Sequence, residues 1–246
     1  MMLPGTLCDA RVFGPLREHL VKVETRVMLT PEAKSMREAA EQVLAGAPER
    51  FALLGFSLGG MVAMETALCS PERVRGLALI STSPRPVLPE QHGSRRAGVE
   101  QARTMGIGQF LGEQLWPQYC GSMKRVATLP LLKTMAESMG HAVFAQQTEM
   151  ALGREDYRPR LPQVACPAMV LAGVEDKICP PAMQRELAAA LRDCTCVMLP
   201  GAGHMALLEE PDEVAAAVAA WFHTVERNET NASNDAPGVV SLKENE

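Results

Sequence analysis

A serine between two glycines is the feature of this sequence that points most directly to chemistry. Ser57 lies in the run Gly-Phe-Ser-Leu-Gly at residues 55–59, after the apolar run of residues 51–55 and before a run with helical spacing. A strand that turns sharply into a helix exposes the serine hydroxyl at the helix N-terminus, where free N–H groups favour the negative charge of acyl transfer. Glycines relieve the crowding of such a turn. The pattern predicts Ser57 as a nucleophile, with an incidental serine in a glycine-rich turn as the alternative.

A serine hydroxyl becomes nucleophilic when a base accepts its proton, so the sequence should also supply a histidine. His204 lies in a glycine-rich loop between the apolar run of residues 194–199 and the last helical run. A loop in that place can hold a side chain over the edge of a sheet, which makes His204 the predicted general base. The other histidines fall in helical runs or in the segment of residues 85–160, where a solvated or hydrogen-bonded histidine is the simpler interpretation: His19, His92, His141 and His223.

The histidine in turn needs an acid that fixes its tautomer. Asp176 follows the apolar run of residues 168–173 and a turn. That position places it at the carboxyl end of a sheet, where chemistry gathers in open α/β folds, and Asp176 is the predicted acid. Glu175 is one alternative, and a solvated acid in a surface turn is the other.

Short apolar runs alternate with longer runs of helical spacing, which indicates a mainly parallel sheet flanked by helices. The predicted strands are residues 21–29, 51–55, 74–81, 168–173 and 194–199. The predicted helices are residues 33–44, 58–68, 181–191 and 211–225. Together they give an α/β core of residues 1–84 and 161–225.

The segment of residues 85–160 interrupts this alternation and is predicted to be an inserted helical cap. Its methionines could line an adaptable apolar pocket but are more simply core packing: Met105, Met123, Met135, Met139 and Met150. Arg95, Arg96 and Arg103 are interpreted as a solvated helix face, with contact to an acidic substrate as the alternative. Residues 226–246 lack apolar periodicity and are predicted to be a disordered tail.

The chain order Ser57, Asp176, His204 and the glycine-flanked serine resemble the α/β-hydrolase superfamily, in particular its cap-bearing bacterial esterase-like branch. Residues 3–6, Leu-Pro-Gly-Thr, resemble its oxyanion loop, and residues 70–74, Ser-Pro-Glu-Arg-Val, resemble its approach to a later strand. The resemblance extends from residue 3 to residue 225. It implies an oxyanion hole formed by the backbone N–H groups of Leu58 and Thr6, with no cofactor and no metal. A simple Pro-Gly turn is the alternative for residues 3–6.

The resemblance also implies two further strands, and most of a third, before the loop of residues 3–6. Only Met1, Met2 and Leu3 stand there, so the N-terminal strands are expected to be missing or truncated. Backbone groups facing the gap are then expected to lack ladder partners, at a cost of about 1–3 kcal/mol for each buried, unpaired group. We therefore expect a version extended upstream by roughly 20–30 residues to be more stable.

Composition argues against several classes of protein. A chain of 246 residues with 47% hydrophobic content can bury one large core, and a net charge of -5 with scattered Lys and Arg argues against nucleic acid as a partner. No run approaches the roughly 20 apolar residues of a membrane helix, and the first residues lack a secretion pattern, so no membrane partner is expected. Seven cysteines without paired spacing favour the reducing cytoplasm. Cys194 and Cys196 are interpreted as strand packing rather than metal ligands.

These residues predict a cofactor-free carboxylic ester hydrolase that acts on a small, apolar molecule through an acyl-enzyme on Ser57. The same triad can hydrolyse a carbon–carbon bond or a lactone, and the sequence leaves both open. A ligand-binding protein with this fold and no turnover is a further alternative. The sequence also leaves open the physiological substrate and the oligomeric state.

Overall fold

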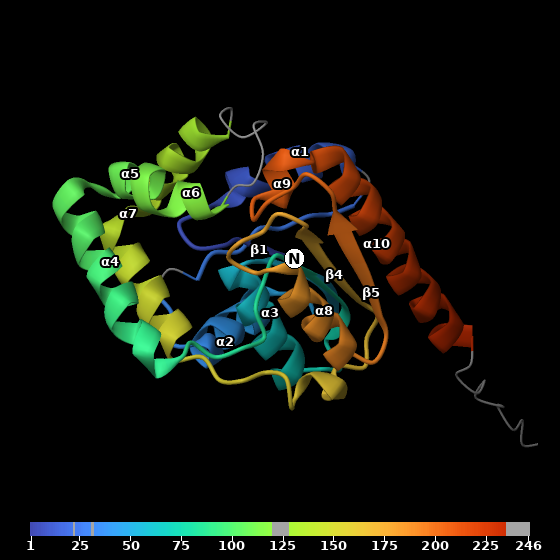
Figure 1. Cartoon of the computed structure of the whole chain (residues 1–246). Coiled ribbons are helices and arrows are strands. Elements are labelled where there is room, and N and C mark those ends of the chain that lie inside the picture. Colours follow the sequence, from blue (N-terminus) through green and yellow to red (C-terminus); the bar gives the residue numbers. More distant parts are fainter. Residues whose placement is uncertain (22, 31, 120–127, 235–246) are drawn as a thin grey trace, which may run out of the picture.

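The strands form one parallel sheet whose spatial order follows the chain. In the computed structural model, which describes residues 1–21, 23–30, 32–119 and 128–234, the strand order is β1-β2-β3-β4-β5 (Figure 1). Each strand is parallel to its neighbours. The strands are β1 (Met2–Leu3), β2 (Phe51–Phe56), β3 (Val74–Ile80), β4 (Ala168–Gly173) and β5 (Cys194–Leu199). The last two strands have the predicted bounds. Strand β2 is one residue longer than predicted, and β3 is one residue shorter.

Helices cover both faces of this sheet. Along β3, Leu77 and Leu79 lie in one apolar cluster, whereas Ala78 and Ile80 lie in the other. This alternation is what a strand buried on both faces requires. The first cluster includes residues of α2 (Met36–Gly46), α3 (Leu58–Cys69) and α8 (Pro181–Ala190). The second includes residues of η1 (Ala10–Phe13), α1 (Gly14–His19), α9 (Ala206–Glu209) and α10 (Pro211–Asn234).

Helix α2 begins later than predicted because Ser35 caps it. The Ser35 hydroxyl accepts a hydrogen bond from the Glu38 N–H at 3.1 Å, and the Glu38 carboxylate accepts one from the Lys34 N–H at 2.9 Å. These reciprocal bonds are similar to a capping box and satisfy donors that a helix N-terminus leaves free. The predicted helix of residues 33–44 therefore starts at Met36.

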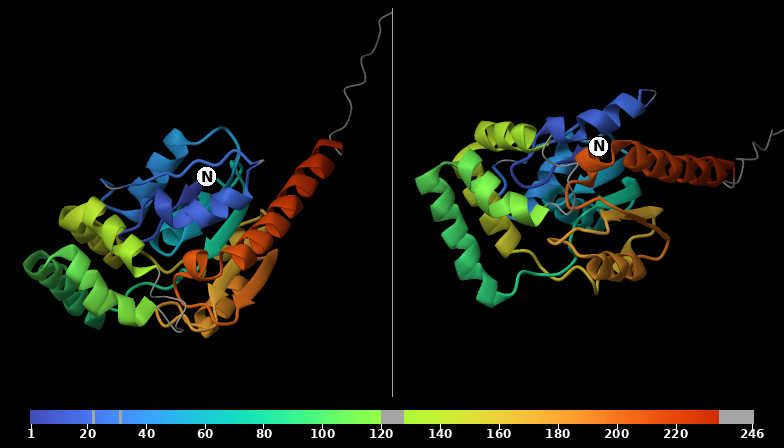
Figure 2. Two further views of the ribbon diagram at one scale, coloured as in Figure 1. Left: turned by 90° about the horizontal axis from the view of Figure 1, so that it is seen from above. Right: turned by 45° about the horizontal axis from the view of Figure 1, so that its top comes forward.

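Within the described part of the cap segment, residues 85–160, all regular secondary structure is helical. Figure 2 shows its long helices grouped to one side of the sheet. The long helices are α4 (His92–Met105) and α7 (Leu129–Leu152). Shorter elements accompany them: the 3-10 turn η2 (Pro89–Gln91), the helices α5 (Ile107–Phe110) and α6 (Trp116–Tyr119), and the π-helical segment η3 (Leu111–Leu115). Helix α7 has a kink at Gly140, whose φ is 78°. After α7, the chain returns to the sheet through η5 (Leu161–Gln163).

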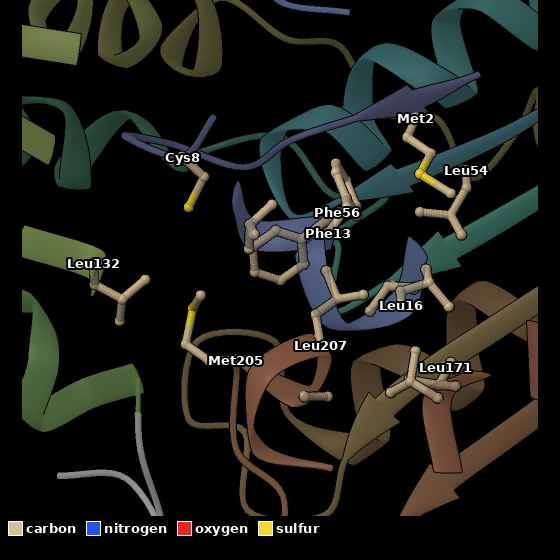
Figure 3. Packing of buried hydrophobic residues seen from close by; sticks show 14 of the residues in the cluster. Met2, Cys8, Phe13, Leu16, Leu54, Phe56, Leu132, Leu171, Met205 and Leu207 are labelled. Atoms are coloured by element: carbon tan, nitrogen blue, oxygen red, sulfur yellow. The ribbon is translucent and has the colours of Figure 1, made fainter. Parts of the chain in front are cut away.

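The cap segment and the sheet share one apolar cluster. Leu132 and Met135 from α7 belong to the same cluster as Phe56 from β2 and Leu171 from β4. Figure 3 shows Leu132 of α7 together with Phe56, Leu171 and Met205 of this cluster. The cap helices are therefore packed against the core through buried side chains.

The predicted strand of residues 21–29 is wrong. Within its described residues the segment makes one isolated bridge, between Val27 and Met2. The Met2 N–H donates to the Arg26 carbonyl at 2.8 Å, and the Met28 N–H donates to the Met2 carbonyl at 3.0 Å. The neighbouring strand, β1, has only two residues, so residues 21–29 have no further strand residues to pair with. These bonds also supply partners for Met2 that were expected to be absent.

The prediction of a disordered tail is wrong for residues 226–234, because α10 continues through them. Glu229 anchors this extension: its carboxylate pairs with Arg75, and an oxygen lies 3.6 Å from the guanidinium of Arg50. Sequence periodicity does not reveal such ion pairs between distant segments. Residues 235–246, the rest of the predicted tail, lie outside the described residues. None of the described helices combines the length and apolar character needed to cross a membrane.

Candidate active site

Ser57 lies in a tight turn between β2 and α3. Its φ of 51° and ψ of -114° are unusual for a residue with a side chain. A Cβ added at Gly55 would lie 2.4 Å from the Gly59 carbonyl oxygen, and one at Gly59 would lie 2.1 Å from the Leu3 carbonyl oxygen. Neither position has room for a side chain. The glycine-flanked serine thus forms the strained strand-to-helix turn that its pattern predicts.

The end of β3 holds this turn in place. The Ser57 N–H donates to the Ile80 carbonyl at 2.9 Å. The Ser57 carbonyl accepts a hydrogen bond from the hydroxyl of Thr82 at 2.7 Å. Sequence reasoning missed Thr82, although its place just after a strand, at the carboxyl edge of the sheet, was a signal that could have found it.

The structure brings Ser57, His204 and Asp176 together in one hydrogen-bonded row. The Ser57 Oγ and His204 Nε2 atoms are 3.0 Å apart, and the His204 Nδ1 and Asp176 Oδ2 atoms are 2.9 Å apart. A carboxylate can only accept, so Nδ1 carries the proton and Nε2 is left to accept the Ser57 hydroxyl proton. The Asp176 and His204 side chains are 0% and 4% exposed, which removes competing water.

Asp176 is fixed by its own loop. Its Oδ1 atom accepts hydrogen bonds from the N–H groups of Ile178 and Cys179, both at 2.8 Å, while Oδ2 faces His204. The carboxylate is therefore oriented from both sides. The alternative acid, Glu175, has its N–H bonded to the Ala202 carbonyl at 2.9 Å. Of the two acids, Asp176 is the one that the structure pairs with His204.

A buried carboxylate holds the loop that carries His204. Glu209 of α9 accepts hydrogen bonds from the Gly203 N–H at 2.8 Å and from the Met205 N–H at 3.0 Å. The residues before and after His204 are thus clamped by one side chain, which is 7% exposed. Sequence reasoning missed Glu209, which lies in the short helix α9 just before the predicted helix of residues 211–225.

Aromatic groups flank the imidazole of His204. The ring centroid of Phe56 is 5.5 Å away, and that of Tyr119 from the cap segment is 5.3 Å away. The His204 N–H also donates to the Tyr119 carbonyl at 2.7 Å. The cap segment therefore touches the candidate base directly. Nothing in the sequence around Tyr119 indicated this contact.

The predicted oxyanion donors come from two different segments near Ser57. Leu58 is the first residue of α3, and Thr6 lies in the loop after β1. That loop passes close to the nucleophile, since a Cβ added at Gly5 would lie 3.1 Å from the Ser57 Cβ atom. Among the hydrogen bonds of the described residues, none uses the N–H of Thr6 or of Leu58. Both groups are available to a developing oxyanion.

Asp176, Cys179 and His204 also place three potential metal-ligand atoms within 4.8 Å of one another. Burial, with a contribution from Asp176, raises the pKa of the Cys179 thiol well above its usual value. The thiol therefore stays protonated, whereas metals bind the thiolate. Asp176 and His204 are already bonded to each other. The cluster is better described as a hydrogen-bonded triad with a neutral thiol beside it.

Comparison with known proteins agrees with this geometry. A model described as "Alpha/beta hydrolase family" matches residues 9–217. A pimeloyl-(acyl-carrier protein) methyl ester esterase of Xanthomonas oryzae pv. oryzae is 30% identical over 251 residues, covering 92% of this chain and 95% of that protein. The esterase of the same name from Chromobacterium violaceum is 31% identical over 177 residues, covering 70% of each chain.

Solved structures show the same fold. A thermophilic esterase from Thermogutta terrifontis superposes with a TM-score of 0.81 at 27% identity, covering 91% of this chain and 89% of that one. An enol-lactonase from Burkholderia xenovorans has a TM-score of 0.79 at 23% identity, covering 90% of both chains. The predicted α/β-hydrolase fold and the predicted class, a carboxylic ester hydrolase, are confirmed. Because the family model matches most of this chain, the chain belongs to the alpha/beta hydrolase family.

Proposed function

We propose that this protein hydrolyses carboxylic esters through an acyl-enzyme on Ser57, with His204 as general base and Asp176 as the acid that orients it. The observation that carries the proposal is the 3.0 Å separation of the Ser57 Oγ and His204 Nε2 atoms. At that distance the imidazole can accept the hydroxyl proton as the oxygen attacks.

The reaction then follows in two halves. Ser57 Oγ attacks the ester carbonyl carbon while its proton passes to His204 Nε2, and Asp176 stabilises the imidazolium by accepting its Nδ1–H. His204 returns the proton to the leaving alcohol as the carbon–oxygen bond breaks. Water next attacks the acyl-enzyme with His204 again as base, which releases the carboxylic acid and restores Ser57.

Backbone N–H groups stabilise the tetrahedral intermediates in this scheme. Leu58 supplies one at the start of α3, where the helix dipole also favours negative charge, and Thr6 supplies the other. Leu58 is supported by its place directly after Ser57 at the start of α3, and Thr6 by the position of its loop beside Ser57. Neither step needs a cofactor.

For the substrate, we propose the methyl ester of an acyl chain carried on an acyl-carrier protein. The support is the name shared by the two relatives, one of them aligned over 95% of its length. The sequence alone predicted an ester of a small, apolar molecule, and the relatives favour a carrier-borne ester instead. The carrier-borne chain would enter beneath the cap segment, the part of the molecule that touches His204 through Tyr119.

The side chains of the cap segment support neither alternative for substrate binding, a methionine-lined pocket or arginines that contact an acidic substrate. Met135 and Met150 are 0% and 2% exposed and belong to the apolar clusters, as core packing requires, and Met123 lies outside the described residues. Arg96 is paired with Glu149 at 2.7 Å, and Arg103 with Glu100 at 2.9 Å. We therefore base the substrate proposal on the relatives rather than on these side chains.

We also propose the cytoplasm as the place of action. The described cysteines are free thiols, including the partly exposed Cys69 and the exposed Cys196. Free thiols at the surface suit a reducing compartment.

The test compares ester substrates side by side with the purified protein. We expect methanol release from the methyl ester of a pimeloyl-loaded acyl-carrier protein, with a kcat/KM at least about tenfold above that for dimethyl pimelate, because remote contacts with the carrier add binding energy. A series of p-nitrophenyl esters and a lactone complete the panel. Ser57→Ala serves as the matched control for all substrates.

The outcomes separate the alternatives. Turnover of simple esters without preference for the carrier would retain the esterase and refute the proposed substrate. Turnover of the lactone alone would favour the lactonase alternative. Binding of the carrier-borne ester without any turnover, and without labelling by a fluorophosphonate, would make this a binding protein.

A further inference from the structure

A hydrogen bond joins the cap segment to the loop that carries Thr6. The N–H of Leu7 donates to the side-chain Oε1 of Gln147 at 2.9 Å, across 140 positions of sequence. Gln147 lies in α7, in the cap segment, and Leu7 directly follows the proposed oxyanion donor. Because the Leu7 N–H can only donate, the carbonyl oxygen of the Gln147 amide must face it.

Leu7 has a backbone conformation that needs support. Its φ is 58°, in the left-handed region that a branched apolar residue rarely adopts. The residue is also 1% exposed, so solvent cannot replace a lost partner for its N–H. Such a conformation persists only where the surroundings hold it. Gln147 is the described side chain that bonds to this N–H.

The core fixes the other side of the loop. The Cys8 N–H donates to the Gly5 carbonyl at 3.1 Å and closes a turn around Thr6 and Leu7. Gly5 packs closely against the Phe56 ring: a Cβ atom added at Gly5 would lie only 2.9 Å from the ring. The loop is therefore held by the sheet from one side and by Gln147 from the other.

We infer that Gln147 is a positioning residue that keeps the Thr6 N–H aimed at the oxyanion, so that the cap segment helps to assemble the oxyanion hole. This inference rests on the proposed function. Without the amide oxygen, Leu7 can relax toward a negative φ, and the peptide plane between Thr6 and Leu7 rotates. The Thr6 N–H, one peptide away, then no longer points where the tetrahedral intermediate develops its charge.

The kinetic signature of this role differs from that of a substrate contact. An oxyanion donor stabilises the transition state more than the bound ester, so its misplacement lowers kcat and leaves KM nearly unchanged. Loss of a whole donor costs about 10²–10³ in kcat. Gln147 acts through one intervening residue, and we expect a loss of about tenfold.

The experiment compares Gln147→Leu with Gln147→Glu. Leucine fills the space and removes the acceptor, whereas alanine would open room for a water molecule that could accept the same N–H. Glutamate keeps an acceptor oxygen at the same reach. With p-nitrophenyl esters, we expect Gln147→Leu to lose about tenfold in kcat with KM within about twofold, and Gln147→Glu to retain most of wild-type kcat. Gln146→Leu is the control, since this neighbouring glutamine has no hydrogen bond to the loop among the described residues.

Melting temperatures of all variants are measured alongside, and Gln147→Met replaces Gln147→Leu if the latter fails to fold. Wild-type kcat in both acceptor-free variants would overturn the inference. So would a loss that Gln147→Glu does not restore or that Gln146→Leu shares. If the wild type hydrolysed no ester, the proposed function would fail by itself. The rate of Ser57 labelling by a fluorophosphonate would then still test Gln147, because the phosphonyl oxygen uses the same N–H groups.

Discussion

Residues with left-handed φ gather at one edge of this molecule. Among the described non-glycine residues, those with positive φ are Leu7, Ser57 and Ser81. They follow β1, β2 and β3, so all three lie toward the carboxyl edge of the sheet. Backbone strain is kept where the surroundings impose it, and in folded proteins it concentrates at functional sites. Here it aims the Ser57 hydroxyl and bends the loop that carries Thr6.

The first prediction concerns the nucleophile. Ser57→Ala should abolish ester turnover, with a loss of about 10³-fold or more in kcat, because no acyl-enzyme can form. The fold should remain, since the Ser57 backbone bonds to Ile80 and Thr82 do not use the hydroxyl. Steady-state kinetics and circular dichroism check the two parts. Retention of more than about a tenth of wild-type kcat would contradict the assignment.

The second prediction separates the two neighbouring acids. Asp176→Asn should lower kcat at least about a hundredfold, because the amide can no longer hold the Nδ1–H tautomer of His204. Glu175→Gln, the matched control, should cost little, since no hydrogen bond to His204 is formed by Glu175 among the described residues. Both variants are assayed with the same p-nitrophenyl ester. The reverse ranking would give the role to Glu175.

The triad could be predicted from sequence because each member follows a recognisable strand. Ser57, Asp176 and His204 each stand just after an apolar run, and the topology of a parallel sheet brings such positions to one edge. The residues that hold them could not be predicted in this way. Gln147 acts on a loop 140 positions away, and a contact between distant segments leaves no local pattern. Glu209 bonds to residues only four and six positions before it, but it lies in a short turn of helix that the apolar periodicity did not mark.

At the scale of elements, charge pairs tie α8 to the two ends of the cap segment. Glu186 in α8 lies 2.7 Å from the guanidinium of Arg85 and 3.1 Å from that of Arg158. Arg158 also contacts Asp156 at 2.6 Å. The network therefore links the segments that leave and re-enter the core. The sequence predicted α8 closely but not the network, since the alternation of apolar runs carries no information on ion pairs.

The third prediction tests this network through pH. Hydrogen bonds from Arg85 and, to a smaller extent, from Arg158 lower the pKa of Glu186 below its usual value of 4.5. The folded state therefore favours the carboxylate: the stabilisation is present above pH 4.5 and is lost as the pH falls through the folded-state pKa. Since the group is partly exposed, Glu186→Gln should lower the free energy of unfolding by about 1 kcal/mol or less near pH 7.

The measurement is urea unfolding of wild type and Glu186→Gln from about pH 7 down to about pH 3, where the difference between them should shrink. Glu72→Gln is the control, because Glu72 is exposed and has no ion pair among the described residues. A difference that stays constant over this range would assign the effect to packing rather than charge.

At the scale of the whole molecule, the cap segment is part of the core rather than an appendage. It shares a buried apolar cluster with both β2 and β4, and it bonds to the loops of His204 and Leu7. The sequence predicted an inserted helical cap because the alternation of strands and helices breaks at about residue 85. That boundary is visible as a change of pattern, whereas the shared cluster depends on which faces of the inserted helices turn inward.

The last prediction is that the cap segment and the sheet unfold together. The chain has two tryptophans, Trp116 in α6 of the cap segment and Trp221 in α10, where its indole N–H donates to the Pro167 carbonyl at 3.1 Å. In Trp221→Phe the remaining tryptophan, Trp116, reports on the cap segment (the cap reporter). In Trp116→Phe the remaining tryptophan, Trp221, reports on the core (the core reporter). In each variant, the urea midpoint from tryptophan fluorescence should coincide with that from far-ultraviolet circular dichroism, which is the test of a two-state transition.

Leu132→Ala in α7 provides the perturbation. Leu132 is 1% exposed and lies in the shared cluster, so its truncation should cost about 2–5 kcal/mol. If the two parts are one cooperative unit, the substitution lowers both reporters' midpoints by the same amount, although it lies in the cap segment alone. Thr134→Ala, two positions further along α7 at an exposed site, should move neither midpoint appreciably. A cap reporter that shifts while the core reporter stays in place would show that the cap segment unfolds independently, and its hydrogen bond to Leu7 would then be lost before the sheet itself gives way.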